Sequence, residues 1–259
     1  MSTRLAAVAS FDDQRPAGPV YRSIIAVDLE GSTTRTDPVK GELRRVMYDL
    51  LERCLETVGV TGNRLERMAD RGDGVLVLIR PHDAVPKTVL LDRLVPLLAS
   101  GLAEHNVQAA DPALRMRLRA VLHAGEVNVD SRGFYGEAID VAIRLLDARQ
   151  VKRTLKQSAA PLVLVVSDDI YFGIVCHGYG DPGGYLPLVH VNVMNRRHRG
   201  WVQVPALAPV TAAAAVPAPG RPSGAPRAPA SASTGEGAEH RVPAVIGRTR
   251  GDMAGSAAS

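Results

Sequence analysis

The chain has 259 residues, 46% of them hydrophobic, so it can bury one substantial core. Its formal net charge of +4 is a small, scattered excess, which argues against a nucleic-acid-binding surface. With only Cys54 and Cys176, the chain offers neither a disulfide framework nor a thiolate metal site. No apolar run reaches the roughly 18 residues of a membrane span, and residues 1–20 lack the order of a signal peptide, so we expect a soluble, cytoplasmic protein.

In chain order, the first predicted elements follow an irregular, disordered segment, 1–20. A β-branched apolar run predicts a strand, and Asp37-Pro38 then marks a helix start. Apolar residues at helical spacing predict a second helix, bent near Pro96. The expected elements are a strand at 23–29, a helix at 37–58, strands at 63–69 and 74–80, and a helix at 90–102.

The second half of the chain opens with an alternating run from Arg115 to Val127, which predicts a strand with one polar face. We interpret Arg115, Arg117 and Arg119 as a solvent-facing row on that strand. The later expected elements are a helix at 136–148, a strand at 162–166, a short helix capped at 167–169, and strands at 185–194 and 200–204 joined by a basic turn, Arg196-Arg197-His198-Arg199. From Pro205 onward Ala, Pro, Gly and Ser dominate, which predicts a disordered tail over 205–259.

Two aspartates occupy predicted strand ends and carry the chemistry of the chain. Asp28 ends the first apolar strand before Glu30-Gly31-Ser32-Thr33, and Asp73 lies in a Gly-Asp-Gly turn before another strand. A carboxylate at such a position is exposed and rigidly aimed. Two of them together would form a hard-oxygen site for Mg²⁺ or Mn²⁺, ions that commonly hold a triphosphate.

Three separated segments, 27–33, 71–74 and 122–144, share an order and spacing that resembles the catalytic domain of class III nucleotidyl cyclases. The third segment carries Leu122-His123-Ala124-Gly125-Glu126 followed by Gly133-Phe134-Tyr135-Gly136-Glu137. The resemblance covers residues 21–204. It implies an α+β fold, a ferredoxin-like mixed β-sheet with helices packed on it, which agrees with the order of the predicted elements.

The resemblance also implies a function for individual residues: conversion of a nucleoside triphosphate to a 3′,5′-cyclic nucleotide and pyrophosphate. Asp28 and Asp73 match the aspartates that bind two divalent ions, Mg²⁺ or Mn²⁺, with the carbonyl of Leu29 as a further ligand. The turn Glu30, Gly31, Ser32 and Thr33 would offer backbone N–H groups to phosphate. Arg144 matches the arginine that stabilises the transition state. Since family sites form between two protomers, a homodimer with shared active sites is implied.

The chain departs from the family pattern at several matched positions. Asp140 stands where asparagine usually contacts the ribose, and Met194 stands where a phosphate-binding lysine is often found. Arg196 or Arg197, just beyond Met194, would substitute for that lysine. Ala69 and Gly133 match the positions that read a purine, and neither side chain can hydrogen-bond a base.

A further pattern, Arg67-Met68-Ala69-Asp70-Arg71, resembles the pyrimidine cyclases of bacterial antiphage signalling, which make cyclic CMP or cyclic UMP. A guanidinium can donate to a pyrimidine carbonyl, so Arg67 and Arg71 would help form a base pocket. The alternative is that both arginines, evenly spaced, face solvent from one side of a strand. We interpret His123 as a packed structural histidine rather than a general base.

Two function classes remain open. The first is a metal-dependent nucleotidyl cyclase, supported by Asp28, Asp73 and Arg144. The second is a catalytically lapsed domain that keeps the fold and the dimer and regulates a partner, supported by Asp140 and Met194.

Overall fold

The computed structural model describes residues 18–207. Residues 1–17, and the part of the predicted tail beyond residue 207, lie outside the described residues. The elements in chain order are β1 (Val20–Leu29), α1 (Asp37–Thr57), β2 (Leu65–Asp70), β3 (Gly74–Ile79), α2 (Lys87–Val89), a π-helical turn (Leu90–Leu94), α3 (Val95–Gln108), β4 (Leu118–Val129), β5 (Phe134–Tyr135), α4 (Glu137–Leu146), α5 (Arg149–Gln157), β6 (Leu162–Ser167), α6 (Asp168–Gly173), β7 (Leu186–Val193) and β8 (Arg196–Gln203).

These strands form one mixed sheet, which confirms the predicted α+β fold. The strand order is β2-β3-β1-β4-β6-β8-β7, and the short strand β5 pairs with the end of β4. The β4–β6 pair is parallel and the other pairs are antiparallel. β1 lies between β3 and β4, so a residue at its end is flanked by backbone on both sides.

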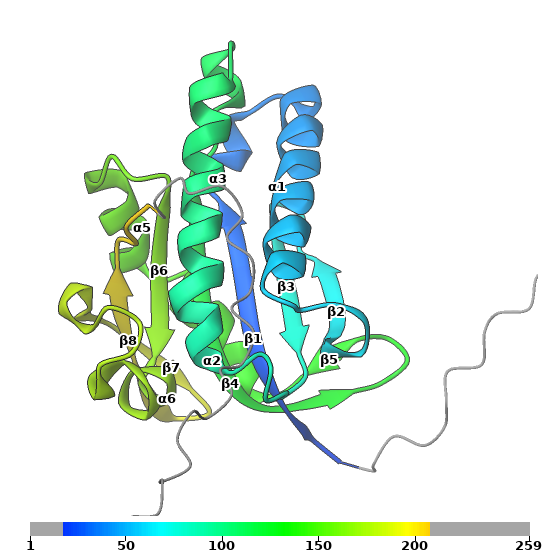
Figure 1. Cartoon of the computed structure of the whole chain (residues 1–259), viewed down its shortest axis with the longest axis vertical. Helices are drawn as coiled ribbons and strands as arrows, with labels where there is room; N and C mark the ends of the chain where they lie inside the picture. The colour runs from blue at the N-terminus through cyan, green and yellow to red at the C-terminus, as the bar shows by residue number, and fades with distance from the viewer. Residues whose placement is uncertain (1–17, 208–259) are drawn as a thin grey trace, which may run out of the picture. The chain divides into compact units, whose positions relative to one another are not determined.

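Helices cover both faces of this sheet and create two core clusters. Figure 1 shows α1 and α3 running side by side across one face. Alternate side chains of β1 point to opposite faces of the sheet. Ile25 and Val27 pack under α1 and α3, whereas Ile24 and Ala26 pack against α4 and α5. Because both faces are covered, a polar side chain on either face needs a partner. No helix among the described residues is long and apolar enough to cross a membrane.

The helix preceding β4 is irregular just before Pro96, close to where the sequence predicts a bend. Pro96 cannot donate a backbone hydrogen bond, and its ring would clash with the preceding helical turn. The chain accommodates it with the π-helical turn Leu90–Leu94, in which Val95 N–H donates to the carbonyl of Leu90. The helix then continues as α3, with proline tolerated in its first turn.

The prediction that Arg196–Arg199 form the turn between the last two strands is wrong. The turn consists of Met194 and Asn195, at φ 49° and 59°, and the arginines that follow belong to β8. A two-residue hairpin loop of this kind places both central residues in the left-handed region, which fits the twist of the strands it joins. The sequence gives little sign of it, because methionine is uncommon at positive φ.

Two elements were not predicted: α5 and the short strand β5. α5 buries only Val151 and Leu155, one turn apart, and its other residues are polar or basic, so it has too few apolar residues to be recognised as a helix. β5 has only two residues and forms because the chain turns back on β4 at Asp130–Gly133. Neither element carries enough apolar pattern to be found from the sequence.

Candidate functional site

Asp28 and Asp73 lie next to each other at one end of the sheet, as predicted. Asp28 is in register with Gly74 across the β1–β3 pair, which brings Asp73 beside the end of β1. Leu29 N–H donates to the carbonyl oxygen of Asp73 at 2.9 Å, so the Gly-Asp-Gly turn is fixed to the strand end. A Cβ at Gly74 would overlap the carbonyl oxygen of Val27, so this close approach requires glycine.

The turn after β1 is tied to the same pair of strands. Gly31 adopts φ 68°, which lets the chain enter a short 3₁₀ turn at Ser32–Thr34. The Ser32 hydroxyl donates to the Asp73 carboxylate. Glu30 N–H donates to the carbonyl oxygen of Arg117 at 2.9 Å, which anchors the start of the turn. The prediction that this N–H binds phosphate is therefore wrong for Glu30, because the donor is already used within the fold. We call residues 30–33 the phosphate turn, after the function that the sequence predicts for them.

These residues line a pocket of about 450 Å³. Eight predicted site residues contribute to it: Asp28, Leu29, Glu30, Gly31, Ser32, Thr33, Arg71 and Asp73. The rest of the lining comes from β1, β4, α4 and α5, including Arg119, Ile143, Asp147, Lys152 and Lys156. The pocket therefore mixes carboxylates with guanidinium and ammonium groups, as a site for a metal and an anion does.

The interpretation of Arg115, Arg117 and Arg119 as a solvent-facing row is wrong for two of the three residues. Arg119 is buried, at 9% exposure, and forms an ion pair with Asp28, its direct neighbour in the β1–β4 register. Burial lowers the pKa of the Arg119 guanidinium. The polar face of β4 meets α4 and α5 rather than water, so its charged residues are paired.

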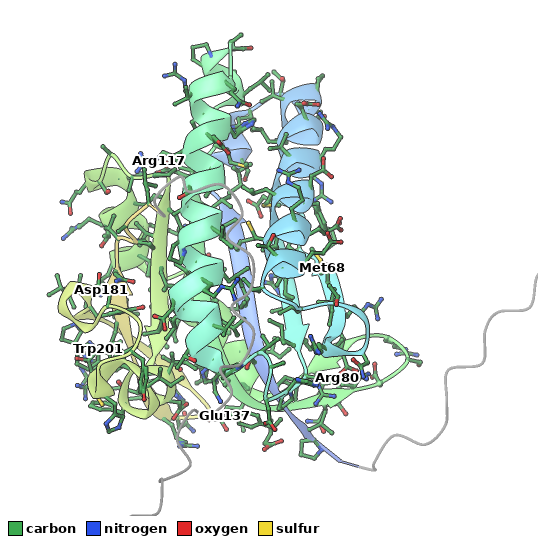
Figure 2. All side chains as sticks on the ribbon, in the orientation of Figure 1. Met68, Arg80, Arg117, Glu137, Asp181 and Trp201 are labelled. Carbon is green, nitrogen blue, oxygen red and sulfur yellow. The ribbon has the colours of Figure 1, made fainter. Side chains whose placement is uncertain are left out.

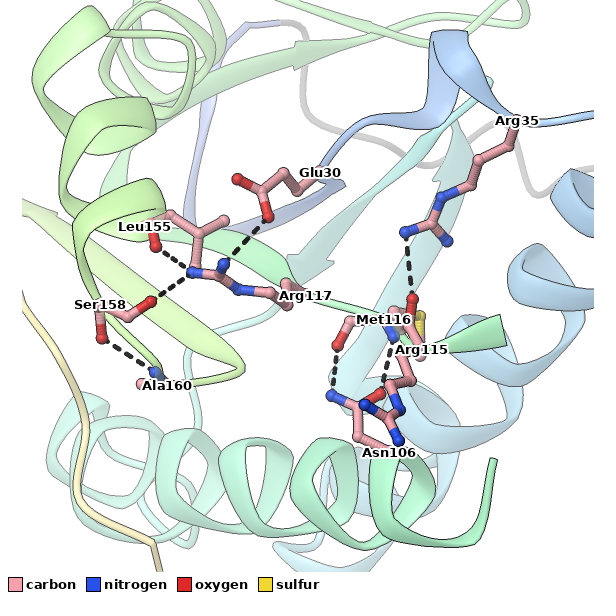
Figure 3. A network of polar contacts seen from close by, with 9 residues as sticks. All are labelled: Glu30, Arg35, Asn106, Arg115, Met116, Arg117, Leu155, Ser158 and Ala160. Atoms are coloured by element: carbon pink, nitrogen blue, oxygen red, sulfur yellow. Dashed lines mark hydrogen bonds and ion pairs between the residues drawn. The ribbon is translucent and has the colours of Figure 1, made fainter. Parts of the chain in front are cut away.

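Arg117 connects three parts of the site. Its guanidinium donates to the carbonyl oxygens of Leu155 and Ser158, the latter at 2.8 Å, and lies 3.5 Å from a carboxylate oxygen of Glu30 (Figure 3). Leu155 is in the last turn of α5, so Arg117 joins this helix to the phosphate turn. The sequence analysis missed Arg117, Arg119 and the two lysines of α5 as site residues.

The site residues fit a divalent hard cation. Asp28 Oδ2 is buried and accepts no hydrogen bond among the described residues, although Arg119 lies against it. No group of three His, Cys, Asp or Glu side chains within residues 18–207 is arranged to hold a metal alone. Mg²⁺ typically takes one or two carboxylates and completes its shell with phosphate oxygens and water, which two aspartates beside an anion pocket can provide.

The other predicted site residues lie outside this pocket. Asp140 and Arg144 are exposed on α4, whose Ile143 and Leu146 do line the pocket. Arg197 is exposed on β8, next to the hairpin turn that contains Met194. Figure 2 shows Glu137, at the start of α4, far from Arg117 at the other end of the sheet, so α4 runs toward the pocket.

The predicted base-pocket residues divide into two places. Arg71 lies beyond the end of β2 and lines the pocket, so it does not share a strand face with Arg67. The Arg67 guanidinium carbon lies 5.8 Å from the centre of the Phe134 ring, close to Gly133 in the chain. Ala69 packs, with Phe134, against the core cluster under α4. Arg67 and Ala69 thus lie near Phe134 or in the cluster that it packs against, and Arg67, Ala69 and Gly133 do not line the pocket of Asp28 and Asp73.

His123 is a packed histidine, as predicted. It is 5% exposed, and its Nδ1 lies 2.7 Å from the Ser167 hydroxyl oxygen. Burial lowers the pKa of His123 to about 4, because the charged imidazolium is poorly solvated there. The residue lies outside the pocket lining, so its chemistry supports the fold.

Comparison with solved structures agrees with this architecture. An adenylate/guanylate cyclase/hydrolase from Silicibacter pomeroyi aligns at a TM-score of 0.51 and 19% identity, covering 73% of this chain and 99% of that chain. The guanylyl cyclase Cya2 aligns at a TM-score of 0.50 and 15% identity, covering 74% and 95% of the two chains. No protein-family model and no curated protein sequence matches the chain. The chain therefore has the fold of the class III adenylate and guanylate cyclase catalytic domains, as its motifs predicted.

Proposed function

We propose that the protein is a metal-dependent nucleotidyl cyclase, which converts a nucleoside triphosphate to a 3′,5′-cyclic nucleotide and pyrophosphate. The observation that carries this proposal is the adjacency of Asp28 and Asp73 beside the phosphate turn, joined by the Leu29–Asp73 backbone hydrogen bond. Two strand-end carboxylates next to an anion pocket are what such chemistry requires. The cyclase fold agrees with it.

The reaction is an in-line displacement at the α-phosphorus. The ribose 3′-oxygen forms a bond to this phosphorus, the bond to the β-phosphate oxygen breaks, and the 3′-hydroxyl proton is released. Bound Mg²⁺ or Mn²⁺, two ions per site, would supply positive charge beside the attacking and leaving oxygens. Asp28, Asp73 and the Leu29 carbonyl would hold these ions, and the N–H groups of Gly31, Ser32 and Thr33 in the phosphate turn would orient the triphosphate.

The active sites would be shared between two protomers of a homodimer. Arg144 is exposed on α4 and does not line the pocket of its own chain, which suits a residue that acts on the partner's substrate. It would stabilise charge on the pentavalent phosphorus. Asp140, one helical turn earlier on the same face, would contact the ribose, and Arg197 would contact phosphate from the hairpin.

The substrate base is proposed to be a pyrimidine, giving cyclic UMP or cyclic CMP for antiviral signalling. Arg71 supports this, since it lines the pocket, forms no ion pair within residues 18–207, and can donate to a carbonyl. Arg67, Ala69 and Gly133 would form the base pocket around Phe134.

A product assay tests the proposal. The purified protein is incubated with ATP, GTP, CTP and UTP together and Mn²⁺, and the products are identified by mass spectrometry. We expect one cyclic nucleotide, absent from an Asp73→Ala variant that is folded by circular dichroism. Turnover retained in Asp73→Ala would refute the metal assignment, and the base of the product decides the substrate.

The second candidate function is a lapsed cyclase domain that binds nucleotide and regulates a partner. The Asp28–Arg119 ion pair favours it, because the arginine competes with a metal for the carboxylate. Asp140 also favours it, since a second negative charge near a triphosphate is unfavourable. This candidate predicts nucleotide binding without any product, whichever nucleotide or metal is supplied.

A further inference from the structure

The helix α5 presents two lysines to the pocket. Its buried side is formed by Val151 and Leu155, which pack into the core cluster under α4. Lys152 and Lys156 are one turn apart, so they lie on one face of the helix, and both line the pocket that contains Asp28 and Asp73. The same chain therefore provides the aspartates and, from a separate element, two cations that line the same pocket.

The position of this helix is fixed relative to the phosphate turn. The last carbonyl groups of a helix have no partner within the helix. In α5, Arg117 satisfies two carbonyls at this end, those of Leu155 and Ser158, while the same guanidinium pairs with Glu30 (Figure 3). The carbonyl of Leu155 belongs to the turn that carries Lys156. The backbone of Lys156 is thus joined to the phosphate turn through one partly buried guanidinium, that of Arg117.

Of the two lysines, only Lys152 has an acidic partner within residues 18–207. Asp28 is paired with Arg119, and Asp147 lies 3.3 Å from the Lys152 ammonium group. Lys156 forms no ion pair within residues 18–207. Ammonium groups bind phosphate oxygens as point charges and need no fixed geometry. An anion entering between the phosphate turn and α5 would therefore gain a cation that has no competing carboxylate.

We propose that Lys152 and Lys156 bind the phosphate chain of the ligand from the same protomer that supplies Asp28 and Asp73. The proposed function gives the identity of that ligand, a nucleoside triphosphate, and the inference rests on it only for this identity. The α5 lysines would provide the positive charge that Met194 cannot provide. They contact phosphate rather than base, so they favour triphosphate over monophosphate and are indifferent to the nucleobase.

The test measures binding of inorganic tripolyphosphate in the presence of Mg²⁺ by isothermal titration calorimetry. Lys152→Gln and Lys156→Gln should each weaken binding by about tenfold, the lower end for a charge-assisted hydrogen bond, and the double variant by more. Lys156→Arg should restore most of the affinity. Arg153→Gln is the matched control: it removes one exposed positive charge from the same helix, outside the pocket lining, and should leave the affinity unchanged.

Three results would overturn the inference. They are an unchanged affinity in the double variant, an equal loss in Arg153→Gln, and no tripolyphosphate binding by the unsubstituted protein. If the lysines only balance the carboxylates, the double variant would bind Mg²⁺ alone more tightly and tripolyphosphate no less tightly. None of these readouts requires turnover, so a protein that makes no cyclic nucleotide would refute the proposed function while leaving this inference to be decided separately.

Mixed dimers test whether the lysines act in the same protomer as the aspartates. If they do, the double variant mixed with Arg144→Ala should regain activity through one intact site. Mixed with Asp73→Ala, it should not, because each site then carries a defect. The reverse pattern would place the lysines on the partner's half of the site and refute the arrangement.

Discussion

The ion pair between Asp28 and Arg119 predicts a specific response to substitution with Arg119→Met, which keeps the length and removes the charge. The Asp28 and Arg119 side chains are 16% and 11% exposed, so the aspartate would be left buried without a counter-charge. Removing one partner of a buried pair typically costs about 3–5 kcal/mol. Arg119 Nε is itself buried without a hydrogen bond, so its removal recovers about 1–2 kcal/mol of desolvation. We expect a net loss of about 1–4 kcal/mol in the free energy of unfolding at pH 7.

Two further measurements separate this electrostatic cause from simple loss of packing. The unpaired Asp28 carboxylate should bind Mg²⁺ more tightly in Arg119→Met, since the arginine no longer competes for it. Saturating Mg²⁺ should then recover about 2–3 kcal/mol, the linkage expected at about 100 times the dissociation constant. Unfolding in urea with and without Mg²⁺, with Arg153→Met as an exposed control, measures both effects. A loss below about 1 kcal/mol with no response to Mg²⁺ would show that the pair does not organise the metal site.

Two other substitutions test the close packing around the site and the buried histidine. Gly74→Ala should lower the free energy of unfolding by about 1–3 kcal/mol and weaken metal binding, because its Cβ would push on the carbonyl of Val27. Gly41 in α1 is the control: it has open space around it, so Gly41→Ala should be neutral or stabilising. Equal effects of the two substitutions would contradict the steric reason. For His123, the folded pKa of about 4 lies below the unfolded value near 6.5, so the unfolded chain binds more protons in between and stability falls as the pH drops from about 6.5 to 4. Denaturant titrations at several pH values should show a loss of about 3 kcal/mol in the free energy of unfolding over this range. His123→Gln should remove most of this loss, and His177→Gln, at an exposed histidine, should remove none of it. A pH profile unchanged by His123→Gln would refute the assignment to His123.

Much of the fold was accessible from the sequence because its apolar patterns are strong. The β-branched run ending at Asp28 and the long amphipathic helix after Asp37 carry local signals that agree with the tertiary structure. The adjacency of Asp28 and Asp73 followed from the order of their motifs. Their contact depends on the β1–β3 register, and Gly74 fixes that register by admitting the carbonyl of Val27.

The pocket-facing cations were harder to predict because their signals are not local. α5 has two buried residues in nine, so its sequence resembles a basic loop more than a helix. It is held by the carbonyl contacts of Arg117, a residue 38 positions away from Leu155 in the chain. The two apolar residues, Val151 and Leu155, have helical spacing, but two residues are too few to identify a helix of nine.

Arg117 and Arg119 were wrongly interpreted as solvent-facing because the sequence pattern does not show what covers each face of the sheet. Alternation correctly put Arg119 in a strand, with Arg117 just before it, but it does not say whether that side of the sheet meets water or a helix. In this sheet both faces are covered, so each arginine on the inner face requires an acid within reach. The β1–β4 register supplies it: Asp28 is directly opposite Arg119, and Glu30, just past the end of β1, meets Arg117. Once β1 and β4 are taken as antiparallel neighbours, the two acids near the end of one strand predict the two arginines of the other as their partners. Asp28, the carboxylate expected to bind a metal ion, is then also expected to pair with Arg119. The competition between the metal ion and the arginine for Asp28 can therefore be predicted from the sequence.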